Sequence, residues 1–352
     1  MCSKLIIPFL NNALSLETIA AAIWTISSTG SINSNIKVVF LLDKMKPDLD
    51  KLYATNSIYR SLVECNLVSP DCIEVIHHRT RDMEIPVLVD RQTRVIFLGE
   101  IPDQRFYTES GDGGDLDGDE HLSHTLDSGV IRSKKLEDEE RRLDQFRSLL
   151  ENRSICDFGT GHGLFLDQCV GVASKVSGVE LRRECINDIE KRLGEAVKVK
   201  PSLSDFAESF DVVTIFHVLE HLEDQLTHLK DAWDRLKSGG VIIVEIPHAR
   251  DFLIEQMELE AFYDFGFWSE HLILHTRETI DHYLQEAGFT DIDITPFQRF
   301  GYANHLHWLR HGKPGGHEIF NDIPTEDFDA AYKDFLCQKN WSDTLIAIAR
   351  KP

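Results

Sequence analysis

ICDFGTGHG, residues 155–163, joins an apolar segment to one acidic residue and three alternating glycines, after which Leu164 resumes an apolar pattern. This order is typical of a strand that ends in a tight turn and opens a helix. Glycines let such a turn adopt positive φ angles and bring its N–H groups close to a ligand. A nicotinamide or flavin fold would have its third glycine at position 164, one residue later. The stretch therefore predicts either a turn that binds a ligand without a diphosphate, or a glycine-rich strand end with no ligand.

Further apolar segments follow this turn in a regular order. Residues 174–179 form an expected strand that ends at Glu180, where a carboxylate can accept hydrogen bonds from both hydroxyls of a ribose. Residues 210–216 form an expected buried strand that leads directly into HVLEHLED, residues 217–224. LKSGG then ends a helix, and residues 241–247 form the next strand. This alternation predicts a mostly parallel sheet with right-handed crossovers.

Taken together, DFGTGHG, GVE, FDVVTIFHVLEHLED and LKSGGVIIVEIP resemble the ordered motifs of class I S-adenosylmethionine-dependent methyltransferases. The resemblance implies an α/β, Rossmann-like methyltransferase domain with a mostly parallel seven-stranded sheet that ends in an antiparallel hairpin. It also implies that S-adenosyl-L-methionine is the cofactor and that the protein is a transferase. We expect this domain to span residues 151–352, with an insertion at 300–340.

The preceding residues show an α/β pattern of their own. Helical spacing at 16–28 and 51–64 and apolar runs at 36–42, 72–76 and 93–98 predict a small α/β accessory domain over residues 1–104. Residues 105–150 are expected to form an acidic connector and a lead-in helix at 137–150. Aspartates 115, 117 and 119 suggest a calcium loop, but Leu126 stands where its twelfth ligand should be, so a solvated connector is preferred.

Composition limits the partners and the compartment. The formal net charge of −22 argues against nucleic acid and anionic lipid as partners. No apolar run is long enough for a membrane span, and Pro8 interrupts the short apolar N-terminus, so no secretion signal is expected. The seven cysteines are scattered and form no Cys-x-x-Cys pair, as is typical of reduced thiols in a cytoplasmic protein.

The resemblance assigns the cofactor site to residues at the expected strand ends. The acidic residue before the turn braces the glycines or reaches the methionine ammonium, Glu180 binds the ribose, and Asp205 accepts from the adenine amine or is a plain turn residue. The predicted cofactor-binding residues are Asp157, Gly159, Gly161, Gly163, Glu180, Asp205 and His217.

Three interpretations apply to His217, Glu220 and His221, which we expect at the start of a helix. In the first, His217 lines the cofactor while the other two make structural hydrogen bonds. In the second, His217 takes part in catalysis. In the third, the three residues bind a metal, because E-x-x-E-H resembles the divalent-ion motif of small-RNA and ubiquinone-pathway O-methyltransferases, with His217 in place of the first Glu. We predict no metal.

The residues WSEH at 268–271 resemble the Glu–His element of sugar C-methyltransferases, with Trp268 where those enzymes usually have tyrosine. A neutral imidazole that titrates near the working pH suits a general base. We therefore predict His271 as the catalytic base and Glu270 as its partner. A loop histidine packed on aromatic side chains is the alternative.

Residues 304–317 resemble an N-H-L-x-W-L-x-x-G-x-P-G-G-H segment of methyltransferases from surface-polysaccharide gene clusters. Arginine pairs with phosphate oxygens through two N–H groups, and lysine adds a point charge. We predict that Asn304, His305, Arg310 and Lys313 bind the acceptor, with a phosphate held by the last two. The alternative is a structural cap.

The sequence thus predicts a methyltransferase that acts on a sugar, free or nucleotide-linked, or on a similar small polar acceptor. A metal-assisted O-methyltransferase and a cofactor-binding scaffold without turnover are the alternatives. The sequence does not identify the atom that is methylated.

Overall fold

The computed structural model describes residues 47–103 and 134–352, which belong to one compact unit that extends from Lys46 to Pro352. The predicted helix at 16–28, the predicted strand at 36–42 and the acidic connector with its calcium-like aspartates lie outside the described residues.

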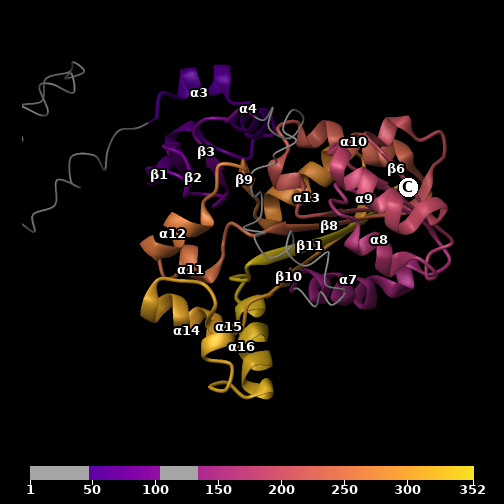
Figure 1. The fold of residues 1–352 in the computed structure, drawn as a ribbon. Helices are drawn as coiled ribbons and strands as arrows, with labels where there is room; N and C mark the ends of the chain where they lie inside the picture. Colours follow the sequence, from indigo (N-terminus) through magenta and orange to yellow (C-terminus); the bar gives the residue numbers. More distant parts are fainter. Residues whose placement is uncertain (1–46, 104–133) are drawn as a thin grey trace, which may run out of the picture. The chain divides into compact units, whose positions relative to one another are not determined.

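The larger sheet has seven strands in the order β10-β11-β8-β7-β4-β5-β6 (Figure 1). Five neighbouring strands are parallel: β4 (Ser154–Phe158), β5 (Lys175–Val179), β6 (Val197–Lys200), β7 (Phe210–Phe216) and β8 (Leu236–Pro247). β11 (Thr344–Arg350) runs antiparallel to both β8 and β10 (Thr290–Phe297). The predicted fold class is confirmed, including the final hairpin.

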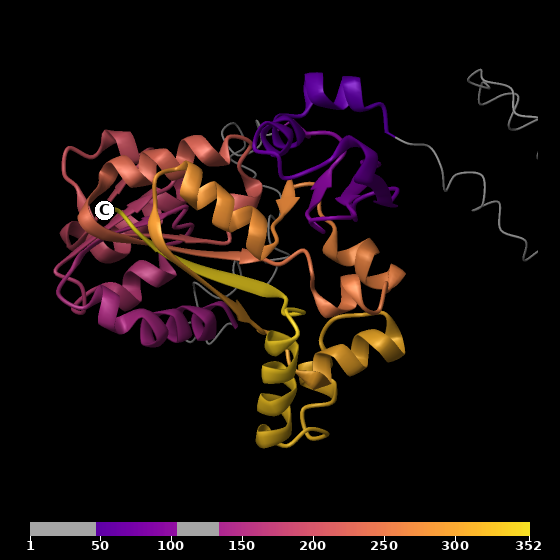
Figure 2. The ribbon, with the colours of Figure 1, turned by 180° about the vertical axis from the view of Figure 1, so that it is seen from behind.

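Helices cover both faces of this sheet (Figures 1 and 2). α10 (Gln225–Arg235) and α13 (Arg277–Glu286) share one buried apolar cluster with the sheet. α7 (Lys134–Leu150), α8 (Leu164–Cys169) and α9 (Arg183–Leu193) contribute to a second cluster, which includes Phe146 and Ile243. Because the central strands are buried on both faces, their sequences are continuous apolar runs, and such runs made them predictable.

A second, four-stranded sheet has the order β1-β2-β3-β9, with every pair antiparallel. Its strands are β1 (Ile73–His77), β2 (Val87–Asp90), β3 (Ile96–Leu98) and β9 (Ile273–Leu274). β9 comes from the methyltransferase part of the chain, so backbone hydrogen bonds cross the predicted boundary at residue 104. The division into folding domains stays a prediction, but the two segments share a sheet.

Two short helices, α3 (Leu49–Thr55) and α4 (Ser57–Glu64), precede this sheet in place of the single helix predicted at 51–64. The break lies at Asn56, whose side-chain oxygen accepts from the N–H of Tyr59 and caps α4. The same side chain donates to the carbonyl of Leu98, 42 residues away. Asparagine is a strong N-cap, and this second bond fixes the break against the sheet.

The remaining helices lie between β8 and β9 and in the insertion. α11 (Phe252–Glu255) and α12 (Glu260–Gly266) follow β8, and α14 (Tyr302–His311), α15 (Gly316–Ile319) and α16 (Glu326–Gln338) separate β10 from β11. Phe262 of α12 packs edge-on against Trp308 of α14, with ring centroids 5.0 Å apart. The two groups of helices therefore pack together beside the sheet.

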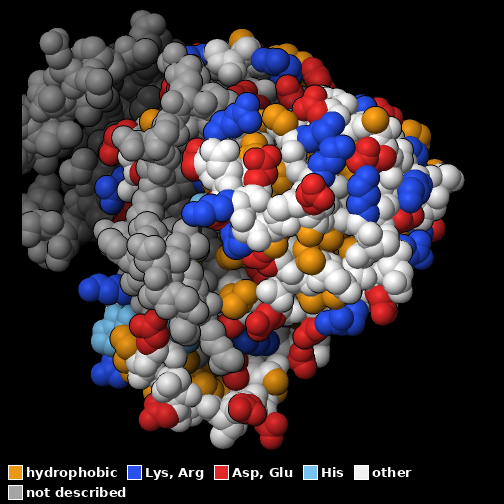
Figure 3. All heavy atoms as spheres, turned by 45° about the vertical axis from the view of Figure 1, so that its right-hand side comes forward, with side chains coloured by type: hydrophobic (Ala, Val, Ile, Leu, Met, Phe, Trp, Pro, Cys, Tyr) orange, Lys and Arg blue, Asp and Glu red, His pale blue; other side chains and the backbone are white. Residues whose placement is uncertain are grey.

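The surface of the described residues shows acidic and basic side chains interspersed over the face in Figure 3. Among the helices of the described residues, none combines the length and the apolarity needed to cross a membrane.

Candidate active site

The glycine turn has the backbone that the sequence predicts. Gly159, Gly161 and Gly163 have φ angles of +77°, +55° and +72°. The N–H groups of Gly159 and Thr160 both donate to the carbonyl of Val179, which attaches the turn to the end of β5. A Cβ on Gly159 would overlap the side chain of Val218, whereas a Cβ on Gly161 would meet only Arg182, at 3.6 Å. Gly159 is therefore needed for packing, and Gly161 leaves the turn open on one side.

Glu180 lies directly after β5 and is bonded to the turn. One oxygen of its buried carboxylate accepts from the N–H of Gly161 at 2.8 Å. The other accepts from the N–H groups of Leu181 and Arg182, at 2.9 and 2.8 Å. The carboxylate is thus held at the carboxyl ends of β4 and β5, where open α/β sheets bind ligands.

The other two predicted cofactor carboxylates differ in exposure. Asp157 is buried and accepts from the hydroxyl of Thr214 at 2.6 Å, so it ties β4 to β7 beneath the turn. Burial raises the pKa of Asp157, although the hydrogen bond from Thr214 opposes this change. Asp205 ends the short 3-10 helix η3 (Leu203–Asp205) and is exposed.

His217 does not begin a helix, so that expectation is wrong. It has a positive φ of 52°, and the residues after it form the 3-10 helix η4 (Leu219–His221); α10 begins only at Gln225. Its Nδ1 lies 3.3 Å from Glu220, and its Nε2 lies 3.3 Å from Glu245. Burial would lower the pKa of His217, but the hydrogen bonds to these two carboxylates raise it. Both ring nitrogens therefore face protein groups.

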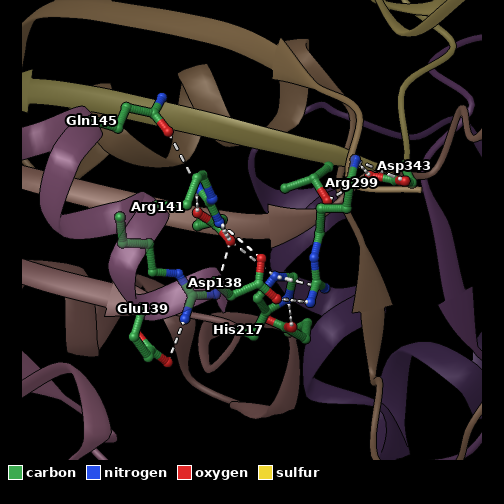
Figure 4. Close-up of polar contacts among 11 residues, drawn as sticks. Asp138, Glu139, Arg141, Gln145, His217, Arg299 and Asp343 are labelled. Atoms are coloured by element: carbon green, nitrogen blue, oxygen red, sulfur yellow. Dashed lines mark hydrogen bonds and ion pairs between the residues drawn. The ribbon is translucent and has the colours of Figure 1, made fainter. Parts of the chain in front are cut away.

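Glu245 is the centre of a buried ionic network that the sequence did not predict. Figure 4 labels Arg141, His217, Arg299 and Asp138 of this network. The Glu245 carboxylate is paired with Arg141 and Arg142 of α7, each at 2.8 Å, as well as with His217. Burial opposes ionisation of Glu245, but these cations lower its pKa strongly. Arg299, from the chain after β10, extends the network to Asp138. The sole sequence signal was a glutamate within an otherwise apolar strand, since a buried charge requires a partner.

A second group joins η4 to the loop after α12. One ligand-type atom from each of Glu220, His221 and His271 lies within 4.8 Å of the others. The rings of His221 and His271 are 4.9 Å apart. The structure therefore brings Glu220 and His221 together with His271, which the metal alternative did not include, while Glu220 also contacts His217. We call these three residues the acceptor cluster.

Electrostatics in the acceptor cluster favour a neutral His271 and an ionised Glu220. Burial, followed by repulsion from His221, lowers the pKa of His271 to about 3. Burial would raise the pKa of Glu220, but the hydrogen bond from His217 and the nearby imidazoles lower it to about 2. One carboxylate oxygen of Glu220 is buried and has no hydrogen-bond partner among the described residues.

The loop that carries His271 is attached to the N-terminal segment. The carboxylate of Asp82 accepts from the N–H of Ser269 at 3.1 Å and from its hydroxyl at 2.5 Å. Trp268 and Glu270 are both buried, and the ring of Trp268 lies 5.5 Å from that of His271. The chain also pairs the N–H of Leu272 with the carbonyl of Glu220 at 2.9 Å. No feature of the sequence predicted that Asp82 would bind Ser269.

Of the predicted acceptor-binding residues, two are buried and two are exposed. Asn304 and His305 lie in the buried part of α14, and His305 Nδ1 is 2.8 Å from the hydroxyl of Tyr332. Arg310 and Lys313 are exposed, and the Arg310 guanidinium lies over Phe320, 6.0 Å from the ring centroid. Their role in acceptor binding stays a prediction.

The chain is similar to known methyltransferases. Residues 132–294 match the family model Methyltransf_23, described as a methyltransferase domain. The mitochondrial ubiquinone biosynthesis O-methyltransferase of Candida albicans is 27% identical over 177 residues, which cover 46% of this chain and 51% of that protein. The chain thus spans about half the length of this relative.

Two further similar proteins are named as S-adenosylmethionine-dependent methyltransferases. A protein of Mycolicibacterium smegmatis, named as a probable S-adenosylmethionine-dependent methyltransferase, is 28% identical over 229 residues, covering 57% of this chain and 82% of its own. The structure of such a methyltransferase from Archaeoglobus fulgidus superposes with a TM-score of 0.43 and 22% identity, over 61% of this chain and 94% of that one.

The strand order and the glycine turn are those of a Rossmann-like methyltransferase fold. With the family match, the chain carries a methyltransferase domain of the S-adenosylmethionine-dependent class, whose cofactor is S-adenosyl-L-methionine.

Proposed function

We propose that this chain transfers the methyl group of S-adenosylmethionine to a small polar acceptor held beside the acceptor cluster. The observation that carries this proposal is the packing of Val218 against Gly159. Because of this packing, the glycine turn lies directly beside the segment that leads to Glu220 and His221. In methyl transfer the sulfur–methyl bond breaks as the bond to the acceptor forms, S-adenosylhomocysteine leaves, and an acceptor oxygen gives up its proton.

The acceptor class that we propose first is a sugar, free or nucleotide-linked. The resemblance of residues 268–271 and 304–317 to sugar and polysaccharide methyltransferases supports it. In this version His271 takes the acceptor proton, assisted by Glu270, and orientation supplies much of the rate. A pKa of about 3 makes His271 a weak base, which counts against this version.

The second candidate is metal-assisted O-methylation, and the acceptor cluster favours it. Two imidazoles and a carboxylate form a donor set for a divalent transition metal that leaves coordination positions for an acceptor. The unpartnered oxygen of Glu220 and the neutral state of His271 fit such an ion, because ligands bind in their deprotonated forms. Glu220, His221 and His271 would hold the metal, which would supply Lewis-acid activation of an acceptor hydroxyl. The relative named for ubiquinone biosynthesis is itself an O-methyltransferase.

One assay tests these alternatives together. The protein is incubated with S-adenosylmethionine and a panel of free sugars, nucleotide-linked sugars and hydroxylated aromatics, and S-adenosylhomocysteine release and product mass are measured. Turnover that survives EDTA supports His271 as the base. Turnover that EDTA abolishes and Mn²⁺, Co²⁺ or Zn²⁺ restores supports the metal. If S-adenosylhomocysteine binds but no acceptor in the panel reacts, the scaffold without turnover becomes the better description.

A further inference from the structure

The loop between β1 and β2 carries an arginine next to the acceptor cluster. The guanidinium carbon of Arg81 lies 4.1 Å from the ring centroid of Trp268 and 5.8 Å from that of Phe265. Trp268 also contacts His271. Arg81 is close enough that its charge contributes to lowering the pKa of His271. A cation from the N-terminal segment therefore lies beside the site where the acceptor is expected.

The side chain of Arg81 has no carboxylate partner within the described part of the chain. Other arginines of the same region do: Arg79 pairs with Asp264 at 2.8 Å, and Arg94 pairs with Glu255 at 3.5 Å. Within the described residues, the contacts of this exposed guanidinium are with the rings of Trp268 and Phe265. Its N–H groups remain able to bind an external anion.

The backbone of Arg81 is fixed to the loop that carries His271. Its N–H donates to the carbonyl of Phe267 at 2.8 Å, and the next residue, Asp82, is bonded to Ser269. A small cavity beside Trp268 and His271 is walled by residues of β2 and β3, including Val87 and Phe97. The N-terminal segment thus borders the candidate site with an apolar wall and with Arg81. A group held in place before binding loses little freedom when a ligand arrives.

We propose that Arg81 binds a phosphate or carboxylate group of the methyl acceptor, so that residues of the N-terminal segment form part of the acceptor site. The inference rests on the proposed function and names the chemistry of its acceptor. A guanidinium presents two parallel N–H donors to an oxyanion, and its stacking on Trp268 leaves the edge of the planar group accessible. The anion is thereby assigned to Arg81 rather than to Arg310.

Direct anion binding by the full-length protein tests this assignment. Inorganic pyrophosphate and malonate are titrated separately into protein saturated with S-adenosylhomocysteine, and binding is measured by calorimetry. We expect one of them to bind and Arg81→Gln to weaken that binding by about tenfold or more, since charge-assisted hydrogen bonds are lost. Arg81→Lys keeps the charge and is expected to retain part of the affinity. Binding of pyrophosphate indicates a phosphate ester, and binding of malonate indicates a carboxylate.

Two comparison variants make the result specific. Arg79→Gln removes a neighbouring cation that is already paired with Asp264, and we expect it to bind the anion as the wild type does. Arg310→Gln tests the rival assignment. The inference is overturned if neither anion binds the wild-type protein, if Arg81→Gln binds with unchanged affinity, or if Arg310→Gln alone loses binding.

The failure of this inference is distinguishable from the failure of the proposed function. S-adenosylhomocysteine affinity is measured first for the wild type, Arg81→Gln and Arg81→Lys. We expect equal values because the side chain of Arg81 lies over Trp268 and Phe265, which are not part of the glycine turn. If the wild-type protein does not bind S-adenosylhomocysteine, the proposed function is contradicted. Equal affinity with no effect of Arg81→Gln on anion binding contradicts only the role of Arg81.

Discussion

The proposed cofactor end and the proposed acceptor end of this domain are assembled in different ways. At the cofactor end, the glycine turn and Glu180 come from consecutive elements, and their main contacts join neighbours such as Gly161 and Glu180. At the acceptor end, Asp82, Glu220 and His271 come from three distant segments that meet through tertiary contacts. The first set of contacts joins elements that are neighbours along the chain, whereas the second depends on how three distant segments pack.

The second sheet shows how the distant segments are held. β9 precedes α13 in the methyltransferase part of the chain, yet it pairs with β3 of the N-terminal segment. Leu272, next to His271, accepts through its carbonyl from the N–H of Leu98 and donates through its N–H to Glu220. His271 is therefore positioned by both segments at once.

The largest effect is expected from breaking the cofactor end alone. Glu180→Ala removes the carboxylate that accepts from Gly161 and that is expected to bind the ribose hydroxyls. Loss of two charge-assisted hydrogen bonds should weaken S-adenosylhomocysteine binding by about 10²–10³-fold. Calorimetry measures the affinity, with Glu184→Ala, an exposed change on α9, as the control. An unchanged affinity would remove Glu180 from the cofactor site.

Removing one residue of the acceptor cluster should leave cofactor binding unchanged. His271→Ala removes one member of the acceptor cluster and should lower turnover by about 10²-fold or more, whether His271 acts as a base or as a ligand. S-adenosylhomocysteine affinity should stay at the wild-type value. His282→Ala, on α13, is the matched control. A parallel fall in cofactor affinity would mean that the two ends are not separate.

A third test concerns the buried Asp251, which caps α11 next to the insertion. Burial, followed by repulsion from Asp343, raises its pKa to about 7. The folded state then keeps a proton between about pH 4 and pH 7 that the unfolded state has released, so this carboxyl makes stability fall as the pH rises through that window. Asp251→Asn abolishes the effect. The variant should therefore exceed the wild type in free energy of unfolding by about 2–4 kcal/mol more at pH 8 than at pH 4.5.

The measurement for Asp251 is a comparison of urea unfolding curves for the variant and the wild type at pH 4.5 and at pH 8, chosen on either side of about pH 7. The difference between the two proteins should be small at the lower pH and large at the higher one. A difference that does not depend on pH would contradict the raised pKa. Titrating groups that do not interact with Asp251 contribute equally to both proteins and cancel in this difference.

The smallest effect is expected from removing the contact between Asp82 of the N-terminal segment and Ser269 of the loop that carries His271. Asp82→Ala removes the acceptor of the Ser269 hydrogen bonds and should raise the KM for the acceptor several-fold, which corresponds to about 1 kcal/mol. Asp82→Asn retains an acceptor oxygen and should restore most of the affinity. Glu84→Ala, an exposed change in the same loop, is the control. An unchanged KM would show that Ser269 is held without Asp82.

Several elements were predictable because their signals are local. The central strands are continuous apolar runs, and the glycine turn follows the first of them as expected. The single helix predicted at 51–64 was wrong because Asn56 bonds to Leu98, a distant residue that sequence spacing does not reveal. The helix expected at His217 was wrong because Glu245 and Glu220 hold that residue at a positive φ angle.

The sequence by itself determined the parallel sheet, the glycine turn and the position of Glu180, since each depends on neighbouring residues and on backbone geometry. Tertiary structure alone decided that His271 lies beside Glu220 and His221. It also decided that Arg141 and Arg142 neutralise Glu245, and that Asp82 binds Ser269 in the loop that carries His271. These contacts join residues far apart in the chain. Their energies depend on burial and charge pairing, which exist only after the segments have packed together.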